Sequence, residues 1–152
     1  MGMAVFPFSW GGEVAEMKKD ELTSAYLSKS EVRLKALYFY RDQAAYSDVV
    51  REAQELVELL LKAVLRAIGV EVPKVHDVGK TLEANQSLLP SLIVTHLHDL
   101  KRISKRLRKE RELSFYGAED FVPTQEYDLS DANQAIEEAE FVYNVVYQAL
   151  TE

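Results

Sequence analysis

The stretch from Ser47 to Ile68 constrains the fold most, because apolar residues recur in it at helical spacing on more than one face. These apolar residues form two neighbouring rows, in which most members are three or four residues apart. One row is Val49, Ala53, Leu56, Leu60, Val64 and Ala67, and the other is Val50, Val57, Leu61, Leu65 and Ile68. A surface helix needs a narrower apolar stripe, so we expect this helix at the centre of a bundle. Ser47 is predicted as its N-cap and Gly69 as its end.

The rest of the chain also shows helical spacing, and no segment shows the alternation of a strand. The other expected helices are Lys18–Ala45, a short helix from about Val75, Leu88–Arg111 with Pro90 in its first turn, and Asp131–Leu150 capped by Ser130. Glu112–Leu129 contains glycine, proline and several aromatic residues, and is predicted to be a long loop that folds back on the bundle. The sequence therefore predicts an all-α, up-down bundle of about five helices, three or four long and one short.

The N-terminal residues differ in character from the rest of the chain. Residues 1–16 are expected to form an apolar arm, with Phe6, Phe8 and Trp10, and residues 17–152 one helical domain. The arm is short, interrupted by proline and glycine, and has no basic flank, so we expect neither a signal peptide nor a membrane span.

The composition limits the possible functions. The chain has no cysteine, which excludes disulfides and thiolate metal sites and makes a cytoplasmic location the default expectation. The net charge is −7, but Lys101–Arg111 holds seven basic residues and one acid, so the remaining residues together carry −13. Such asymmetry favours an anionic partner at one place. The alternative is a solvated helix end, whose basic residues complement the helix dipole.

Three segments together resemble the HEPN (higher eukaryotes and prokaryotes nucleotide-binding) domain family, over roughly Asp20 to Leu150: EAQELVELLLKAVLRAIGVEVPKVHDVG, LRKERELSFYG and SDANQAIEEAEFVYNVV. The resemblance implies an all-α bundle, a homodimer, and association with RNA or nucleotides. It also implies a partner of the minimal nucleotidyltransferase class, as in toxin–antitoxin pairs. We expect no membrane and no DNA among the partners, and no cofactor.

Many members of this family are metal-independent ribonucleases, whose signature is an arginine followed a few residues later by a histidine. Arg111 matches the arginine here, but Tyr116 stands where the histidine is expected. A tyrosine, with a pKa of about 10, is a poor general base at neutral pH. The sequence therefore favours a non-catalytic binding module, with a ribonuclease of altered site, using Arg111 and Tyr116, as the alternative.

The residues expected to bind RNA or nucleotide are Lys105, Arg108, Arg111 and Tyr116. Guanidinium groups bind phosphate through paired hydrogen bonds, and a tyrosine ring can stack on a base. In the structural alternative, Arg111 pairs with a bundle carboxylate such as Glu58, and Tyr116 fills the core.

The remaining polar signals are the histidine–aspartate pairs. Asp77, after His76, is expected to cap the short helix. A less favoured interpretation takes these residues as ligands of an HD-like, metal-dependent phosphohydrolase. That site would use the set His76, His98, Asp99 and a later aspartate, Asp120 or Asp128. We expect no metal site.

Overall fold

The computed structural model describes the backbone of residues 12–72, 77–116 and 127–151, and the side chains of these residues except 12–20 and 111–116. Within these ranges the chain forms helices and turns and no strand, which confirms the all-α prediction. The elements in chain order are α1 (Gly12–Asp42), α2 (Tyr46–Ala67), α3 (Val78–Ala84), the 3₁₀ turn η1 (Gln86–Leu88), α4 (Ser91–Thr95), α5 (Leu97–Tyr116) and α7 (Leu129–Thr151).

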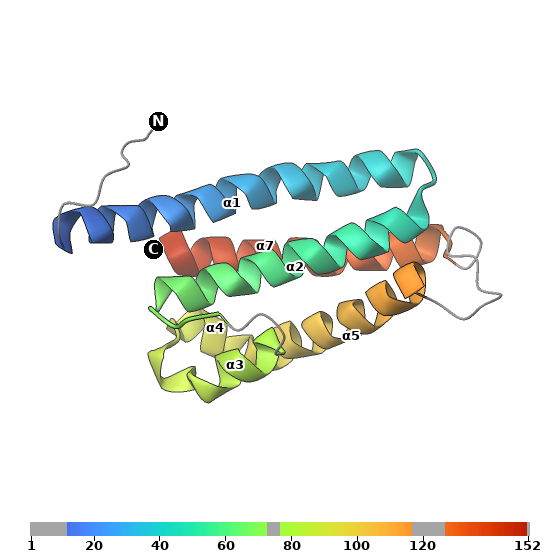
Figure 1. Ribbon diagram of the computed structural model, residues 1–152. Coiled ribbons are helices and arrows are strands. Elements are labelled where there is room, and N and C mark those ends of the chain that lie inside the picture. Colours follow the sequence, from blue (N-terminus) through green and yellow to red (C-terminus); the bar gives the residue numbers. More distant parts are fainter. Residues whose placement is uncertain (1–11, 73–76, 117–126, 152) are drawn as a thin grey trace.

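Helix α2 lies at the centre, as predicted, and packs against α1, α7, α5 and α3 (Figure 1). Both predicted rows are buried from Val49 to Leu65, and only Ala67 and Ile68 are partly exposed. The prediction of Ser47 as N-cap is wrong, because α2 begins at Tyr46 and no side chain caps it. Ser47 is instead buried in the first turn.

The end of α2 follows the prediction. Gly69 has a φ of 78°, which glycine adopts without steric cost, and its N–H donates to the carbonyl of Arg66.

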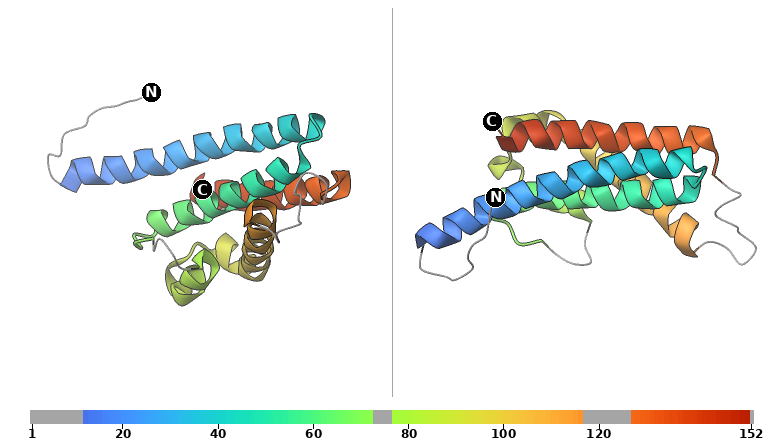
Figure 2. Two further views of the ribbon diagram at one scale, coloured as in Figure 1. Left: turned by 45° about the vertical axis from the view of Figure 1, so that its right-hand side comes forward. Right: turned by 90° about the horizontal axis from the view of Figure 1, so that it is seen from above.

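The long helices α1, α2, α5 and α7 alternate in direction, which is the up-down arrangement expected (Figure 1). Helices α3 and α4 lie between the end of α2 and the start of α5, and α5 crosses the bundle at a steeper angle than α7 (Figure 2). Helix α1 begins at Gly12, so residues 12–16, expected in the arm, are helical, while residues 1–11 lie outside the described ranges. None of the described helices is long and apolar enough to cross a membrane.

The prediction of a single helix over Leu88–Arg111 is wrong for the first half of that range. The chain forms η1, then α4, and α5 begins only at Leu97. Pro90 is the N-cap of α4, and the His96 ring, at the break between α4 and α5, packs edge to face on Phe141 with centroids 5.4 Å apart. The break lets α4 pack on α7 while α5 runs along α2, so tertiary packing overrides an uninterrupted periodic pattern.

The start of α7 also differs from the prediction. Asp128, and not Ser130, caps the helix: its carboxylate accepts from the N–H of Asp131 at 3.0 Å. The Asp131 carboxylate accepts from the N–H of Asp128 at 3.0 Å in return. The two aspartates form a reciprocal capping box, and Ser130 is exposed.

Candidate nucleic-acid interface

Helix α5 has one buried and one solvent-facing side. Leu100, Ile103 and Leu107 are buried in the core shared with α2. On the opposite side Arg102, Lys105 and Lys109 are exposed at steps of three and four residues, so they share one face of the helix. We call these three residues the α5 basic face.

Arg108 turns away from that face toward α3. Its guanidinium lies 2.9 Å from the Asp77 carboxylate, which also accepts the Gly79 N–H at 2.9 Å and so caps α3. Burial raises the pKa of Asp77, but Arg108 and the backbone N–H groups at the helix start outweigh it and hold that pKa below its usual value. The capping role predicted for Asp77 is confirmed.

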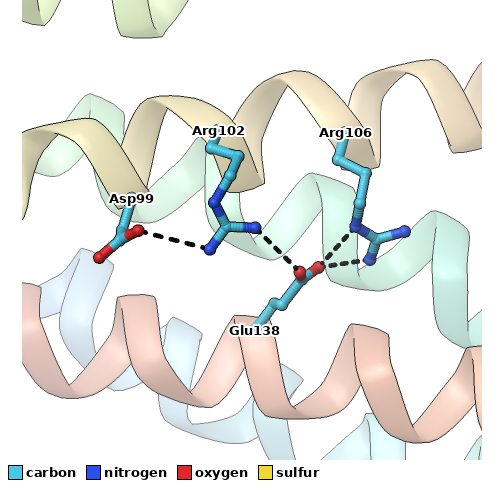
Figure 3. A network of polar contacts seen from close by, with 4 residues as sticks. All are labelled: Asp99, Arg102, Arg106 and Glu138. Carbon is cyan, nitrogen blue, oxygen red and sulfur yellow. Dashed lines mark hydrogen bonds and ion pairs between the residues drawn. The ribbon is translucent and has the colours of Figure 1, made fainter.

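Glu138 of α7 binds two cations of α5 (Figure 3). The Arg106 guanidinium donates to one carboxylate oxygen of Glu138 through Nε at 2.9 Å and through a second nitrogen. Arg102 lies 3.8 Å from the other oxygen and 3.5 Å from Asp99. The Glu138 side chain is only 12% exposed, so this network fastens α5 to α7 across a mostly buried carboxylate.

Lys101 continues the same pattern, because its ammonium lies 2.8 Å from the Glu83 carboxylate of α3. Much of the basic run is thus neutralised by acids of α3 and α7. Lys105 and Lys109 differ: both are exposed, and no ion pair joins either of them to another described side chain. Among the described cations of the run, the unneutralised charge therefore lies on Lys105 and Lys109 of the α5 basic face.

The four predicted binding residues do not share one surface in the described part of the structure. Lys105 lies on the α5 basic face, and Arg108 faces Asp77. Arg111 and Tyr116 belong to the last turns of α5, but their side chains lie outside the described residues. The sequence reasoning missed Arg102 and Lys109, which could have been found from their helical spacing to Lys105.

Glu58, the carboxylate suggested as a partner of Arg111, lies in a hollow of about 340 Å³ between α1 and α2. Its carboxylate accepts from the Gln54 amide at 2.5 Å and pairs with Lys62 at 3.3 Å. Arg33 of α1 also lines the hollow and lies 3.9 Å from Glu55. Acids and bases balance one another along this wall.

Tyr127 joins the end of α5 to the start of α7. Its hydroxyl lies 3.0 Å from both the backbone carbonyl and the carboxylate of Glu110. Burial, followed by these contacts with Glu110, raises the pKa of Tyr127 well above its usual value. Tyr127 packs against the core, which confirms for this residue that the segment before α7 returns to the bundle. The predicted start of the loop is wrong, because residues 112–116 still belong to α5.

The residues of the HD-like alternative do not meet in the described part of the chain. His98 and Asp99 belong to the first turn of α5, and Asp128 caps α7. His76 and Asp120 lie outside the described residues. In the ranges that the structure describes, no three His, Asp or Glu side chains are grouped so that they could hold a metal ion.

This helical bundle matches the model of a known protein family. The family model of the HEPN domain matches residues 23–149, from α1 to the end of α7. The chain belongs to the HEPN family. Searches of curated proteins and of solved structures found no match. The all-α architecture of this HEPN domain and the extent of the match agree with the resemblance seen in the sequence.

Proposed function

We propose that this HEPN domain binds RNA or a nucleotide without catalysis, and that the α5 basic face is the binding surface. The observation that carries the proposal is the pair Lys105 and Lys109. These lysines lie one turn apart, face solvent, and have no carboxylate partner among the described residues, although the protein as a whole is acidic.

The chemistry of the face suits a phosphate backbone. Lysine ammonium groups act as mobile point charges, and Arg102, whose side chain is 53% exposed, adds a guanidinium at the start of the row. Such a row attracts successive phosphates with little regard to sequence. The acidic surface elsewhere repels the same ligand, which favours binding at α5.

The non-catalytic role rests on the signature at the end of α5, where Tyr116 follows Arg111 in place of a histidine. From the family resemblance we further propose a cytoplasmic module that works with a separately encoded minimal nucleotidyltransferase in a toxin–antitoxin pair. Co-purification of the two proteins after joint expression would support that part, and their separation on a sizing column would oppose it.

Charge reversal on the α5 basic face tests the binding proposal. In the double variant Lys105→Glu and Lys109→Glu, affinity for a labelled single-stranded RNA pool should fall at least about tenfold at low salt. The slope of log affinity against log salt should become shallower by roughly 1.4, or about 0.7 for each lost phosphate contact. Fluorescence anisotropy at several salt concentrations measures both quantities.

The matched control is Lys35→Glu with Lys80→Glu, which makes the same change in net charge at exposed lysines of α1 and α3. If both double variants weaken RNA equally, only the overall charge matters and the proposed surface is wrong. Gel analysis of the RNA after incubation in chelator tests catalysis at the same time. Cleavage that is lost on Arg111→Ala would replace the non-catalytic module by the altered ribonuclease.

A further inference from the structure

Two stacked tyrosines lie on α7 at the edge where this helix packs, antiparallel, beside α1 (Figure 2). The rings of Tyr143 and Tyr147 have centroids 5.7 Å apart and an angle of 26° between their planes. Tyr143 packs against the core, whereas Tyr147 is 46% exposed and presents its ring to solvent. We call these two residues the α7 tyrosine pair.

The surroundings of the α7 tyrosine pair are acidic. Burial, then the nearby Glu31 carboxylate of α1 and the Tyr147 hydroxyl, raise the pKa of Tyr143. Lys35 lies 3.9 Å from Glu31, but its side chain is 77% exposed, so this ion pair is weak. Helix α7 contains four acids and no lysine or arginine: Asp131, Glu137, Glu138 and Glu140. A phosphate would be repelled here, so the pair suits a cationic ligand.

The same edge already holds one guanidinium on a tyrosine ring. Arg41 of α1 lies 4.9 Å from the centre of the Tyr38 ring, and the hydroxyl of Tyr38 donates to Glu140 of α7. A tyrosine face with a carboxylate beside it therefore binds arginine within this bundle. In the described part of the chain, no arginine or lysine lies over either ring of the α7 tyrosine pair.

We propose that the α7 tyrosine pair, with Glu31 beside it, binds an arginine of a basic, extended segment in a partner protein. Arginine suits the site better than lysine, because its planar guanidinium stacks on an aromatic ring and also donates paired hydrogen bonds to a carboxylate. The partner is a protein segment and not a nucleic acid, since the charge of this face has the wrong sign for phosphate.

The spacing of the acids along α7 suits arginines at alternate positions. Alternate side chains of an extended chain lie on one side, about 6.6 Å apart. At a rise of about 1.5 Å per helical residue, Glu140 lies roughly 7 Å from the midpoint of the α7 tyrosine pair, and Glu137 roughly 5 Å further on. Three alternate arginines would therefore reach the rings, Glu140 and Glu137 in turn. Because each exposed contact is weak, we expect a dissociation constant on the order of 100 µM.

Fluorescence anisotropy with a labelled peptide, in which three arginines alternate with serines, tests the proposal on the whole chain. Tyr147→Leu should weaken binding about two- to fivefold, and Tyr147→Phe, which keeps the ring, should bind like the natural chain. The same peptide with lysines in place of the arginines should bind several-fold more weakly. A natural chain that binds no peptide, or a Tyr147→Leu variant that binds it unchanged, overturns the proposal.

Tyr26→Leu is the matched control for the ring, because Tyr26 lies on the α2 side of α1 under an arginine of the chain itself, Arg66, 5.6 Å from the ring centre. Its affinity for the peptide should be unchanged. Equal weakening by Tyr26→Leu and Tyr147→Leu would refute the site. Melting temperatures of both variants show that each remains folded.

Glu31→Gln and Glu71→Gln form the matched pair for charge, since both acids are exposed and both variants lose one negative charge. Only Glu31→Gln should weaken the peptide beyond the small effect of net charge, by about two- to threefold. Equal effects would show attraction by the overall charge and contradict the site. The variant Lys105→Glu, Lys109→Glu should keep its affinity for the peptide, so this test is independent of the RNA proposal.

Discussion

Asp77 shows how one side chain joins two parts of this molecule. Its carboxylate satisfies the first backbone N–H groups of α3 and at the same time holds Arg108 of α5 at 2.9 Å. An arginine that looks available for a ligand in the sequence is therefore part of the packing between α3 and α5. Reversing its charge would place two carboxylates together and disturb the fold, so Arg108 is a poor choice for testing RNA binding.

Replacing this arginine should change the acid stability of the protein. In Arg108→Gln the pKa of Asp77 should rise toward its usual value, and the free energy of unfolding at pH 7 should fall by about 0.5–1 kcal/mol, as for partly exposed ion pairs. Because the folded pKa of Asp77 is lowered, its stabilising contribution is present above about pH 4 and is lost as the pH falls through the folded pKa. The variant should lose less stability between pH 5 and pH 3 than the natural chain, in urea titrations.

Lys109→Gln is the control for this measurement, because Lys109 is the exposed neighbour on the α5 basic face. The two variants should differ at pH 7 and converge as the pH falls through the lowered folded pKa of Asp77, below which its carboxyl is protonated. Equal stability of both variants at pH 7 would show that the ion pair contributes nothing.

At the level of elements, the beginning of α7 separates two candidate caps that lie two residues apart. Asp131 donates its backbone N–H to Asp128 at 3.0 Å, whereas Ser130 is exposed. That backbone hydrogen bond lowers the pKa of Asp128, so the cap is formed above about pH 4.

Replacing Asp128 should therefore destabilise the protein, whereas replacing Ser130 should not. Asp128→Ala should lower the melting temperature by a few degrees at pH 7, and by less at pH 3, while Ser130→Ala should leave it nearly unchanged. Thermal unfolding followed by circular dichroism compares them. A larger loss in Ser130→Ala would show that the capping box is not the stabilising contact.

The comparison of α2 with α5 shows what the sequence could predict. Two apolar rows specify a central helix whatever surrounds it, so α2 was found nearly to the residue. The break at His96 depends on Phe141, which lies far along the chain, so local periodicity could not reveal it. The same holds for Glu138: helical spacing could place Arg102 and Arg106 on α5, but not the α7 carboxylate that neutralises both.

The whole molecule combines an acidic bundle with one helix whose cations divide into two sets. Lys101, Arg106 and the partly exposed Arg102 pair with acids of α3 and α7, whereas Lys105 and Lys109 remain in solvent. The overall net charge therefore says little about either set.

The pairing of Arg102 and Arg106 with one carboxylate makes a trade-off between stability and affinity. In Glu138→Gln the free energy of unfolding should fall by about 1–3 kcal/mol, because two guanidinium groups lose a charged acceptor that is mostly buried. Urea titration against Glu137→Gln, the exposed neighbour, measures this loss. Equal losses in both variants would contradict the role given to Glu138.

The same substitution releases positive charge beside Lys105. If RNA lies along the α5 basic face, the less stable Glu138→Gln protein should bind it more tightly than Glu137→Gln does, because the freed guanidinium charge lies beside that face. The comparison is controlled, since the two variants have the same net charge. Selection for a tighter grip on RNA would then work against selection for a firmer bundle. The carboxylate of Glu138 would then set the balance between the stability of the bundle and its affinity for RNA.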